Sequence, residues 1–216
     1  ADHWARPELL PFLASLAIVD GGLRRGGLRG GQTVIINGAT GGLGGAAVLA
    51  ALARGAARVI ATGRRREALN ALETVDPRIR TVVLSGDRAR DRDAIRAETD
   101  AGADLLLDVI AHTPTTDPTL SCVDALRLRG TAVLVGGVRH ELALPYRRIQ
   151  RQQLTVTGSF MFDSATALEV WQLVRSGALN LESVHAHTFG LDQFDAAMDT
   201  AASLSGLDHA VLLPAD

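Results

Sequence analysis

The chain has 216 residues, 47% hydrophobic and 21% charged, a composition typical of a globular protein with one sizeable core. A formal net charge of −2 gives no electrostatic reason to expect a nucleic-acid partner, and the single cysteine, Cys122, excludes an internal disulfide framework and a multi-cysteine zinc site. The early apolar stretch at 9–19 is too short to span a bilayer and follows no signal-peptide pattern, so we expect a cytoplasmic protein without a membrane partner.

Apolar runs rich in β-branched residues alternate with helical patterns along the chain. The predicted strands are 33–37, 58–62, 80–84, 103–109, 131–137, 154–160 and 209–213. The predicted helices are 8–19, 43–54, 65–72, 88–99, 117–128, 164–176 and 192–204, with a glycine-rich turn at 21–31 and a surface loop at 139–153. Strands that alternate with helices and are apolar throughout predict an α/β fold, a doubly wound parallel sheet covered on both faces.

The segment NGATGGLGG, residues 37–45, places five glycines where the first strand passes into a helix. Glycine weakens a helix start, so we expect these positions to bring the backbone close to a ligand. Gly38 would permit a tight turn, Gly41 and Gly42 would leave room for a diphosphate, and Gly44 would pack the helix on the strand. A structural turn without a ligand is the alternative, but the first βα turn is the place where dinucleotides bind.

The second strand ends in Gly63, Arg64, Arg65 and Arg66, where dinucleotide folds that bind NAD carry an acidic residue. Guanidinium groups bind a 2′-phosphate through charge-assisted hydrogen bonds, whereas a carboxylate would repel it. We therefore predict that Arg64 and Arg65 favour NADP(H) over NAD(H). A solvated charge run at a helix start is the alternative interpretation.

The glycine turn resembles those of two enzyme families. The short-chain dehydrogenases need a Tyr-x-x-x-Lys pair, but the residue four positions after Tyr146, the only tyrosine, is Gln150, and the chain has no lysine. The order of ATGGLG, GADLLLDVI, ALRLRGTAVLVGG, LTVTGSFMF and HAHTFGLDQFDAAMD is instead similar to the medium-chain dehydrogenase/reductases, the zinc alcohol dehydrogenase and quinone reductase superfamily, over residues 7–214.

This resemblance implies a six-stranded Rossmann sheet in the order 3-2-1-4-5-6 and a set of cofactor contacts. The implied cofactor-binding residues are Gly38, Ala39, Thr40, Gly41, Gly42, Leu43, Gly44, Gly63, Arg64, Arg65, Asp108, Val109, Ile110, Gly136, Gly137, Ser159 and Phe160. Asp108 is equally compatible with a strand-end residue that caps a loop. The resemblance also implies a homodimer joined through the edge strand near 154–160.

Three regions are expected from the resemblance: a lead-in helix and turn at 1–31, the dinucleotide-binding domain at 32–190, and a helix and strand at 191–216. The last region normally completes an amino-terminal GroES-like catalytic domain, which would carry the metal ligands and most of the substrate pocket. The sequence therefore names no catalytic residue, and we expect no zinc in this chain.

The remaining candidates have plainer explanations. His185 and His187 alternate at strand spacing but lack a third ligand, and His112 follows the fourth strand as a loop histidine or a proton shuttle. Cys122 and Trp171 fit the core, and Asp87 fits a helix cap better than an adenine contact.

The function predicted is the NADP(H)-binding part of an oxidoreductase that transfers hydride between nicotinamide and an alcohol, a carbonyl or an activated alkene such as a quinone or enone. The alternative is a noncatalytic NADP(H)-binding module or sensor.

Overall fold

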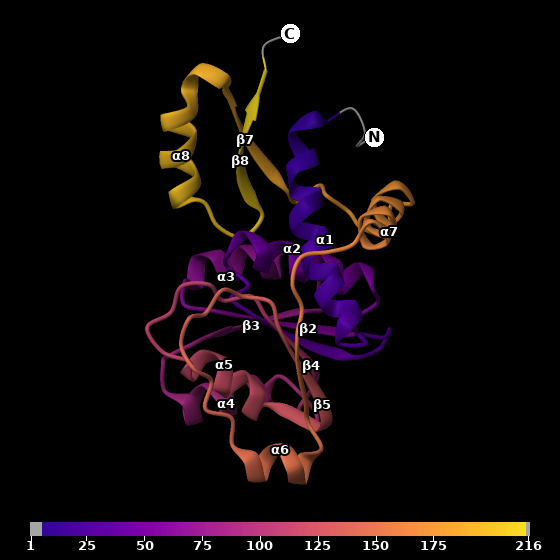
Figure 1. The fold of residues 1–216 in the computed structure, drawn as a ribbon, viewed down its shortest axis with the longest axis vertical. Coiled ribbons are helices and arrows are strands. Elements are labelled where there is room, and N and C mark those ends of the chain that lie inside the picture. The colour runs from indigo at the N-terminus through magenta and orange to yellow at the C-terminus, as the bar shows by residue number, and fades with distance from the viewer. Residues whose placement is uncertain (1–5, 215–216) are drawn as a thin grey trace.

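The computed structural model describes residues 6–214, and a six-stranded parallel sheet forms its centre (Figure 1). The strands follow the order β3-β2-β1-β4-β5-β6, which confirms the predicted Rossmann topology. Their bounds are β1 (Thr33–Asn37), β2 (Arg58–Gly63), β3 (Ile79–Val83), β4 (Ala103–Asp108), β5 (Leu126–Leu134) and β6 (Thr155–Gly158).

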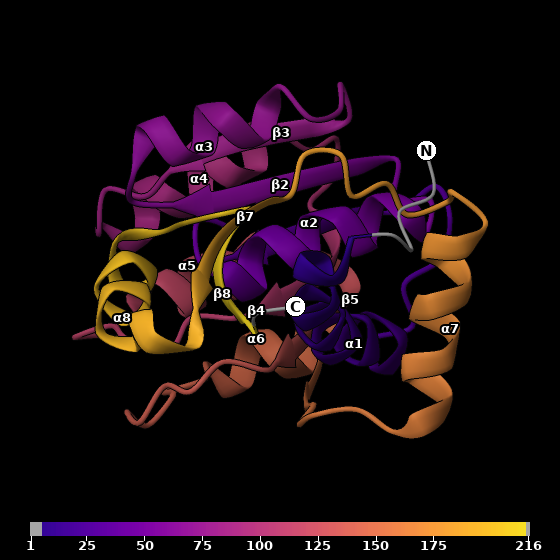
Figure 2. The same ribbon diagram turned by 90° about the horizontal axis from the view of Figure 1, so that it is seen from above.

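Helices cover both faces of the sheet. Their bounds are α1 (Leu10–Arg25), α2 (Gly42–Ala53), α3 (Arg66–Glu73), α4 (Arg88–Ala97), α5 (Asp117–Asp124), α6 (Tyr146–Gln152) and α7 (Ser164–Arg175). One face carries α1, α2 and α3, with α7 beside α1, and the opposite face carries α4, α5 and α6 (Figures 1 and 2).

The middle of each central strand is apolar because its side chains enter two cores. Val34 and Ile36 of β1 pack into the core under α1 and α2, whereas Ile35 packs into the core under α4 and α5. All three are fully buried. Successive side chains point to opposite faces of a strand, so a strand covered on both sides reads as a continuous apolar run.

The glycine-rich turn predicted at 21–31 begins later than expected, after residue 25. A 3-10 helix, η2 (Pro7–Leu9), leads into α1, which continues through Gly21 and Gly22 to Arg25. A Cβ on Gly22 would lie 2.7 Å from Leu107 Cδ1, and one on Gly26 would lie 2.3 Å from Leu105 Cδ1. These two glycines let α1 lie close to the sheet. The prediction of a turn was wrong for residues 21–25, which are helical, and is confirmed by the turns at 26–27 and 30–31.

The helix predicted at 117–128 ends earlier, and the following strand begins earlier than predicted. α5 stops at Asp124, and Leu126, buried in the core under α4 and α5, already pairs with Ala103 of β4. The register then shifts before Leu105 pairs with Thr131. Arg129 has a φ of +62° within this irregularity. Burial of the leucine in a bulged strand outweighs the helical pattern read from the sequence.

The segment predicted as a surface loop at 139–153 contains α6, which follows Pro145. The strand predicted at 154–160 is shorter, because β6 ends at Gly158 and Met161 turns away with a φ of +54°. β5 ends at Leu134, before the predicted residue 137. The other predicted elements are present and differ only at their ends.

A second, two-stranded sheet stands apart from the first. It pairs β7 (His185–Gly190) with β8 (Asp208–Leu213) in parallel, and a 3-10 helix, η3 (Leu191–Gln193), and α8 (Phe194–Ser203) connect the strands. The boundary expected at residue 190 therefore falls between paired strands. Residues 1–5 of the expected lead-in region and 215–216 of the expected C-terminal region lie outside the described residues. Within residues 6–214, no helix is both long and apolar enough to cross a lipid bilayer.

Candidate functional site

The turn between β1 and α2 depends on glycine for its shape. Gly38 has a φ of +89°, and its carbonyl accepts a hydrogen bond from the Gly41 N–H at 3.1 Å. A Cβ on Gly44 would lie 2.1 Å from that carbonyl oxygen, so α2 can start here only with glycine at this position. Ala39 is fully buried, and its N–H donates to the Thr62 carbonyl.

The start of α2 leaves unused hydrogen-bond donors. No side chain caps this helix, and the N–H groups of Gly42, Leu43 and Gly44 donate to no acceptor among the described residues. A Cβ on Gly42 would project into open space. Free amides at a helix N-terminus, together with the helix dipole, favour an anion.

These amides face a groove of about 860 Å³ along the carboxyl ends of the strands. Of the predicted cofactor residues, it is lined by Gly38, Thr40, Gly41, Gly42, Leu43, Gly44, Gly63, Arg64, Arg65, Val109 and Ile110. No Asp or Glu is among the residues that line it.

The two arginines stand at the end of β2. A Cβ on Gly63 would lie 2.7 Å from Thr40 Cγ2, so the absence of a side chain lets the first two βα turns touch. Arg65 Nη2 donates to the Thr40 carbonyl at 3.1 Å, which fixes the guanidinium at the rim. Arg64 is exposed, and among residues 6–214 its side chain has no hydrogen bond or ion pair.

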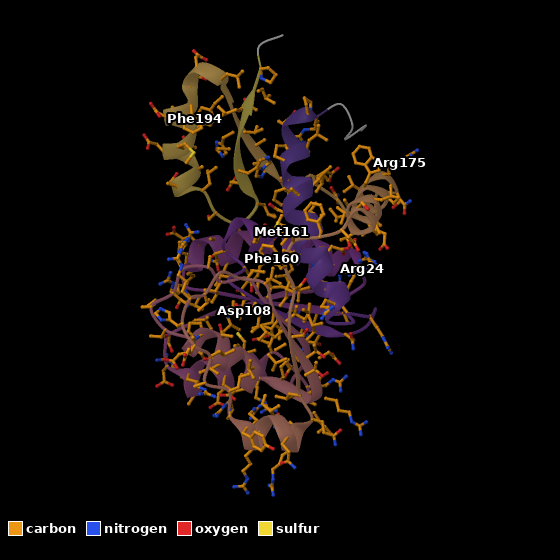
Figure 3. The ribbon with its side chains drawn as sticks, viewed as in Figure 1. Arg24, Asp108, Phe160, Met161, Arg175 and Phe194 are labelled. Carbon is orange, nitrogen blue, oxygen red and sulfur yellow. The ribbon has the colours of Figure 1, made fainter. Side chains whose placement is uncertain are left out.

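Asp108 does not line this groove. It is buried in the interior (Figure 3), where Oδ2 accepts from Thr119 Oγ1 at 2.6 Å and Oδ1 accepts from Asn37 Nδ2 at 3.3 Å and the Ile110 N–H at 3.2 Å. Burial raises the pKa of this carboxyl group, although these hydrogen bonds oppose the shift. The structure thus supports the interpretation of Asp108 as a strand-end residue that holds a loop.

Gly136, Gly137, Ser159 and Phe160 also lie outside the groove. A Cβ on Gly136 would lie 1.9 Å from the Ile110 carbonyl oxygen, so this glycine lets the ends of β4 and β5 meet. Gly137 lines an adjoining hollow. The Ser159 N–H donates to the Leu134 carbonyl oxygen, and Phe160 is 90% exposed.

The C-terminal region supplies part of the rim, a contribution that no sequence motif predicted. Ala202 and Leu204 line the groove, and the Gly206 N–H donates to the Thr40 carbonyl at 2.9 Å. A Cβ on Gly45 would lie 2.3 Å from the Gly206 carbonyl oxygen. The fifth glycine of the turn therefore serves this contact, and its occurrence was the only sequence signal for it.

Asp87 and Cys122 have structural roles. Asp87 caps α4 by accepting from the Arg90 N–H at 2.8 Å, as the cap interpretation predicted. Cys122 is fully buried in the core, and burial raises the pKa of its thiol.

The histidines form no metal site within the described chain. His185 and His187 are exposed on β7, and His187 Nε2 lies 3.8 Å from Asp208 Oδ1. His112 is exposed and lines the groove. No three His, Cys, Asp or Glu side chains within residues 6–214 are placed to hold a metal ion.

Strand order, glycine turn and groove define an α/β protein of the Rossmann class, a nucleotide-binding fold. The sequence profile of the zinc-binding dehydrogenases matches residues 42–176, and the chain belongs to that family. Its residues correspond to the cofactor-binding domain of the medium-chain dehydrogenase/reductases, as the resemblance predicted.

Three known proteins illustrate the relationship. An L-arabinitol 4-dehydrogenase from Talaromyces emersonii is 24% identical over 200 residues, which cover 89% of this chain and 51% of the relative. The alcohol dehydrogenase of Aeropyrum pernix superposes with a TM-score of 0.77 at 22% identity, over 99% of this chain and 60% of that one. A short chain alcohol dehydrogenase from Escherichia coli CFT073, solved with NADH, gives 0.78 at 16% identity, over 95% and 59%. The chain thus spans about half the length of the curated relative.

Proposed function

We propose that this chain binds NADP(H) in the groove and forms the cofactor-binding part of an oxidoreductase. The reaction proposed is hydride transfer between nicotinamide and an alcohol, a carbonyl or an activated alkene. The observation that carries the proposal is the groove itself, with three free amides at the start of α2 and two arginines at the end of β2.

The preference for NADP(H) rests on charge. Arg64 offers a guanidinium that pairs with no other group of residues 6–214, and Arg65 is held at the same rim by the Thr40 carbonyl. With no carboxylate lining the groove, nothing there would repel a 2′-phosphate or bind the two ribose hydroxyls of NAD in its place. A charge-assisted hydrogen bond contributes about 1.5–3 kcal/mol, which is a preference of at least tenfold.

Different segments of the groove would then contact different parts of the cofactor. The free amides of Gly42, Leu43 and Gly44 would hold the diphosphate, and the backbone at Val109 and Ile110 would border the other end of the dinucleotide. When bound, the cofactor supplies the hydride chemistry. The residues described here position it but provide no metal-ligand set, so we assign no step to zinc.

Arg64→Gln and Arg65→Gln test this assignment by isothermal titration calorimetry. We expect each variant to bind NADPH about tenfold or more weakly and NADH with unchanged affinity, because only NADPH carries the 2′-phosphate. The matched control is Arg175→Gln, because Arg175 is an exposed arginine at the end of α7. This variant should change the affinity for neither cofactor. Parallel losses for both cofactors would argue against a 2′-phosphate site.

A noncatalytic NADP(H)-binding module is the second candidate, since the groove and the arginines at its rim account for binding of the cofactor alone. The two proposals differ in turnover. A steady change in NADPH absorbance with an aldehyde or enone substrate supports the enzyme, whereas tight binding of NADPH without turnover supports the module.

A further inference from the structure

The groove continues into a second hollow at the end opposite the arginines of β2. This hollow has a volume of about 680 Å³ and shares Ala111, His112 and Thr113 with the groove. Its other side is formed by the segment after β5, with Gly137, Arg139 and His140. The proposed function would place the adenosine phosphate at Arg64 and Arg65, so the reactive end of the dinucleotide would point toward this hollow.

The side chains around the hollow are rich in unused donors. Arg139, His112 and His140 are exposed, and none of them has a side-chain hydrogen bond or ion pair with another residue of the range 6–214. No carboxylate lines the hollow, and Glu141 follows His140 in sequence without lining it. Asp108, at the end of the neighbouring strand, is buried and accepts hydrogen bonds from Thr119, Asn37 and Ile110.

The donors around the hollow are suited to a negatively charged group. A guanidinium has five N–H donors in a planar fork that matches the oxygens of a carboxylate or phosphate. An imidazole on each flanking loop can add a further donor to the same oxygens. A neutral alcohol would leave these donors to water and gain little from them.

We propose that the substrate carries an oxyanionic group, a carboxylate or a phosphate, which Arg139 binds in this hollow with help from His112 and His140. This proposal rests on the proposed cofactor site, since that site gives the hollow its place beside the reactive end. It assigns Arg139 to substrate specificity rather than to the chemical step.

The test compares matched alcohols binding to the full chain saturated with NADP+, measured by calorimetry. 2-Hydroxybutanoate is compared with 1,2-butanediol, and glycerol 3-phosphate with glycerol. We expect at least one anionic member to bind about tenfold or more tightly than its neutral partner. A preference within the first pair identifies the bound group as a carboxylate, and a preference within the second pair identifies it as a phosphate.

Arg139→Gln should abolish that preference and leave the affinity for NADP+ unchanged, whereas Arg175→Gln should change neither. Equal binding within both pairs, no binding of any of the four compounds, or a preference that survives Arg139→Gln would overturn the proposal. Because the NADP+ affinity is measured first, failure of the cofactor site is distinguished from failure of the substrate site.

Discussion

At the scale of single residues, a buried polar row runs across the carboxyl ends of three strands. Thr62 Oγ1 donates to Asn37 Oδ1 at 2.9 Å, and Asn37 Nδ2 donates to Asp108 Oδ1. The sheet register places these residues side by side, with Asn37 opposite Thr62 on β2 and opposite Asp108 on β4. Buried polar groups that satisfy one another fix a single arrangement of the strand ends beneath the groove.

The pKa of Asp108 is raised by burial, so this carboxyl group holds its proton more tightly in the folded protein than in the unfolded chain. The free energy of unfolding should therefore fall as pH rises from the ordinary value of 3.8 through the raised folded pKa. Asp108→Asn removes this slope, so the stability of the variant relative to the natural protein should increase with pH in urea titrations.

Asp163 should give the opposite dependence of the free energy of unfolding on pH in the same experiment. Its carboxylate caps α7 by accepting from the N–H and the Oγ1 of Thr166, and the Thr166 hydroxyl lowers its pKa most. Its contribution is present above the unfolded pKa and is lost as pH falls through the lowered one. Asp163→Asn should therefore weaken the protein more at neutral than at low pH. If the stability of both variants relative to the natural protein changed with pH in the same direction, both assignments would be contradicted.

At the scale of elements, α1 packs on the sheet through glycine. Gly22→Ala would bring a methyl group to 2.7 Å from Leu107 Cδ1 and 3.0 Å from Val135 Cγ2, and overpacking of this kind costs about 1–3 kcal/mol. The nearest atom to a Cβ on Gly21, in the same helix, is the Met161 carbonyl at 3.4 Å. Gly21→Ala should therefore stabilise the protein by up to about 1 kcal/mol through helix propensity. Equal effects in thermal unfolding would refute the close-packing argument.

A charged contact joins α1, α2 and α7. Arg54 donates to both carboxylate oxygens of Asp20 at 2.7 Å and to Glu169 Oε2 at 3.0 Å. Asp20 has no exposed surface, so Asp20→Asn leaves the arginine without its buried partner and should cost about 3–5 kcal/mol in denaturant unfolding. Glu169 is 39% exposed, so Glu169→Gln should cost no more than about 1 kcal/mol. A large loss for Glu169→Gln and a small one for Asp20→Asn would reverse this interpretation.

The sequence predicted the elements whose signal is local. Continuous apolar runs located the strands of the six-stranded sheet, and the glycines of 37–45 located the first turn, because both follow from the burial and backbone geometry of their own residues. The strand β7, HAHTFG, carries no such run and was not predicted. The length of α1 and the early start of β5 could not be read in this way. They depend on Leu105, Leu107 and Ala103, which are distant in sequence and meet these segments only in the folded sheet.

The site was predictable to a similar extent. The residues of the first two βα turns can be recognised as a binding motif from the local sequence alone. They line the groove together with Val109 and Ile110. Asp108 has a strand-end position but turns inward, because Thr119 and Asn37 offer it buried partners. The contact of Gly206 with Thr40 joins residues far apart in the chain, which no local pattern reports.

At the scale of the whole molecule, the edge strand β6 remains the proposed homodimer interface. It pairs with β5, and no other strand of residues 6–214 pairs with its outer edge. Phe160, Met161 and Phe162 follow it with exposed fractions of 90%, 49% and 38%. An open edge beside apolar side chains is a surface that a second copy of the chain can cover.

Light scattering after size-exclusion chromatography tests the dimer. We expect the natural chain to elute as a dimer and Phe160→Asp to shift it to monomer, because the charge would be buried at the interface. Phe194→Asp, in an exposed residue of α8 near the second sheet, should leave the dimer intact (Figure 3). A natural chain that stays monomeric at high concentration would exclude this interface.

A crystal structure of the chain soaked with NADPH would show directly whether the groove binds the cofactor. We expect density for the diphosphate against the amides of Gly42, Leu43 and Gly44 and for the 2′-phosphate beside Arg64 and Arg65. Density for the nucleotide elsewhere, or a groove that stays free of it at saturating NADPH, would show that this groove is not the cofactor site.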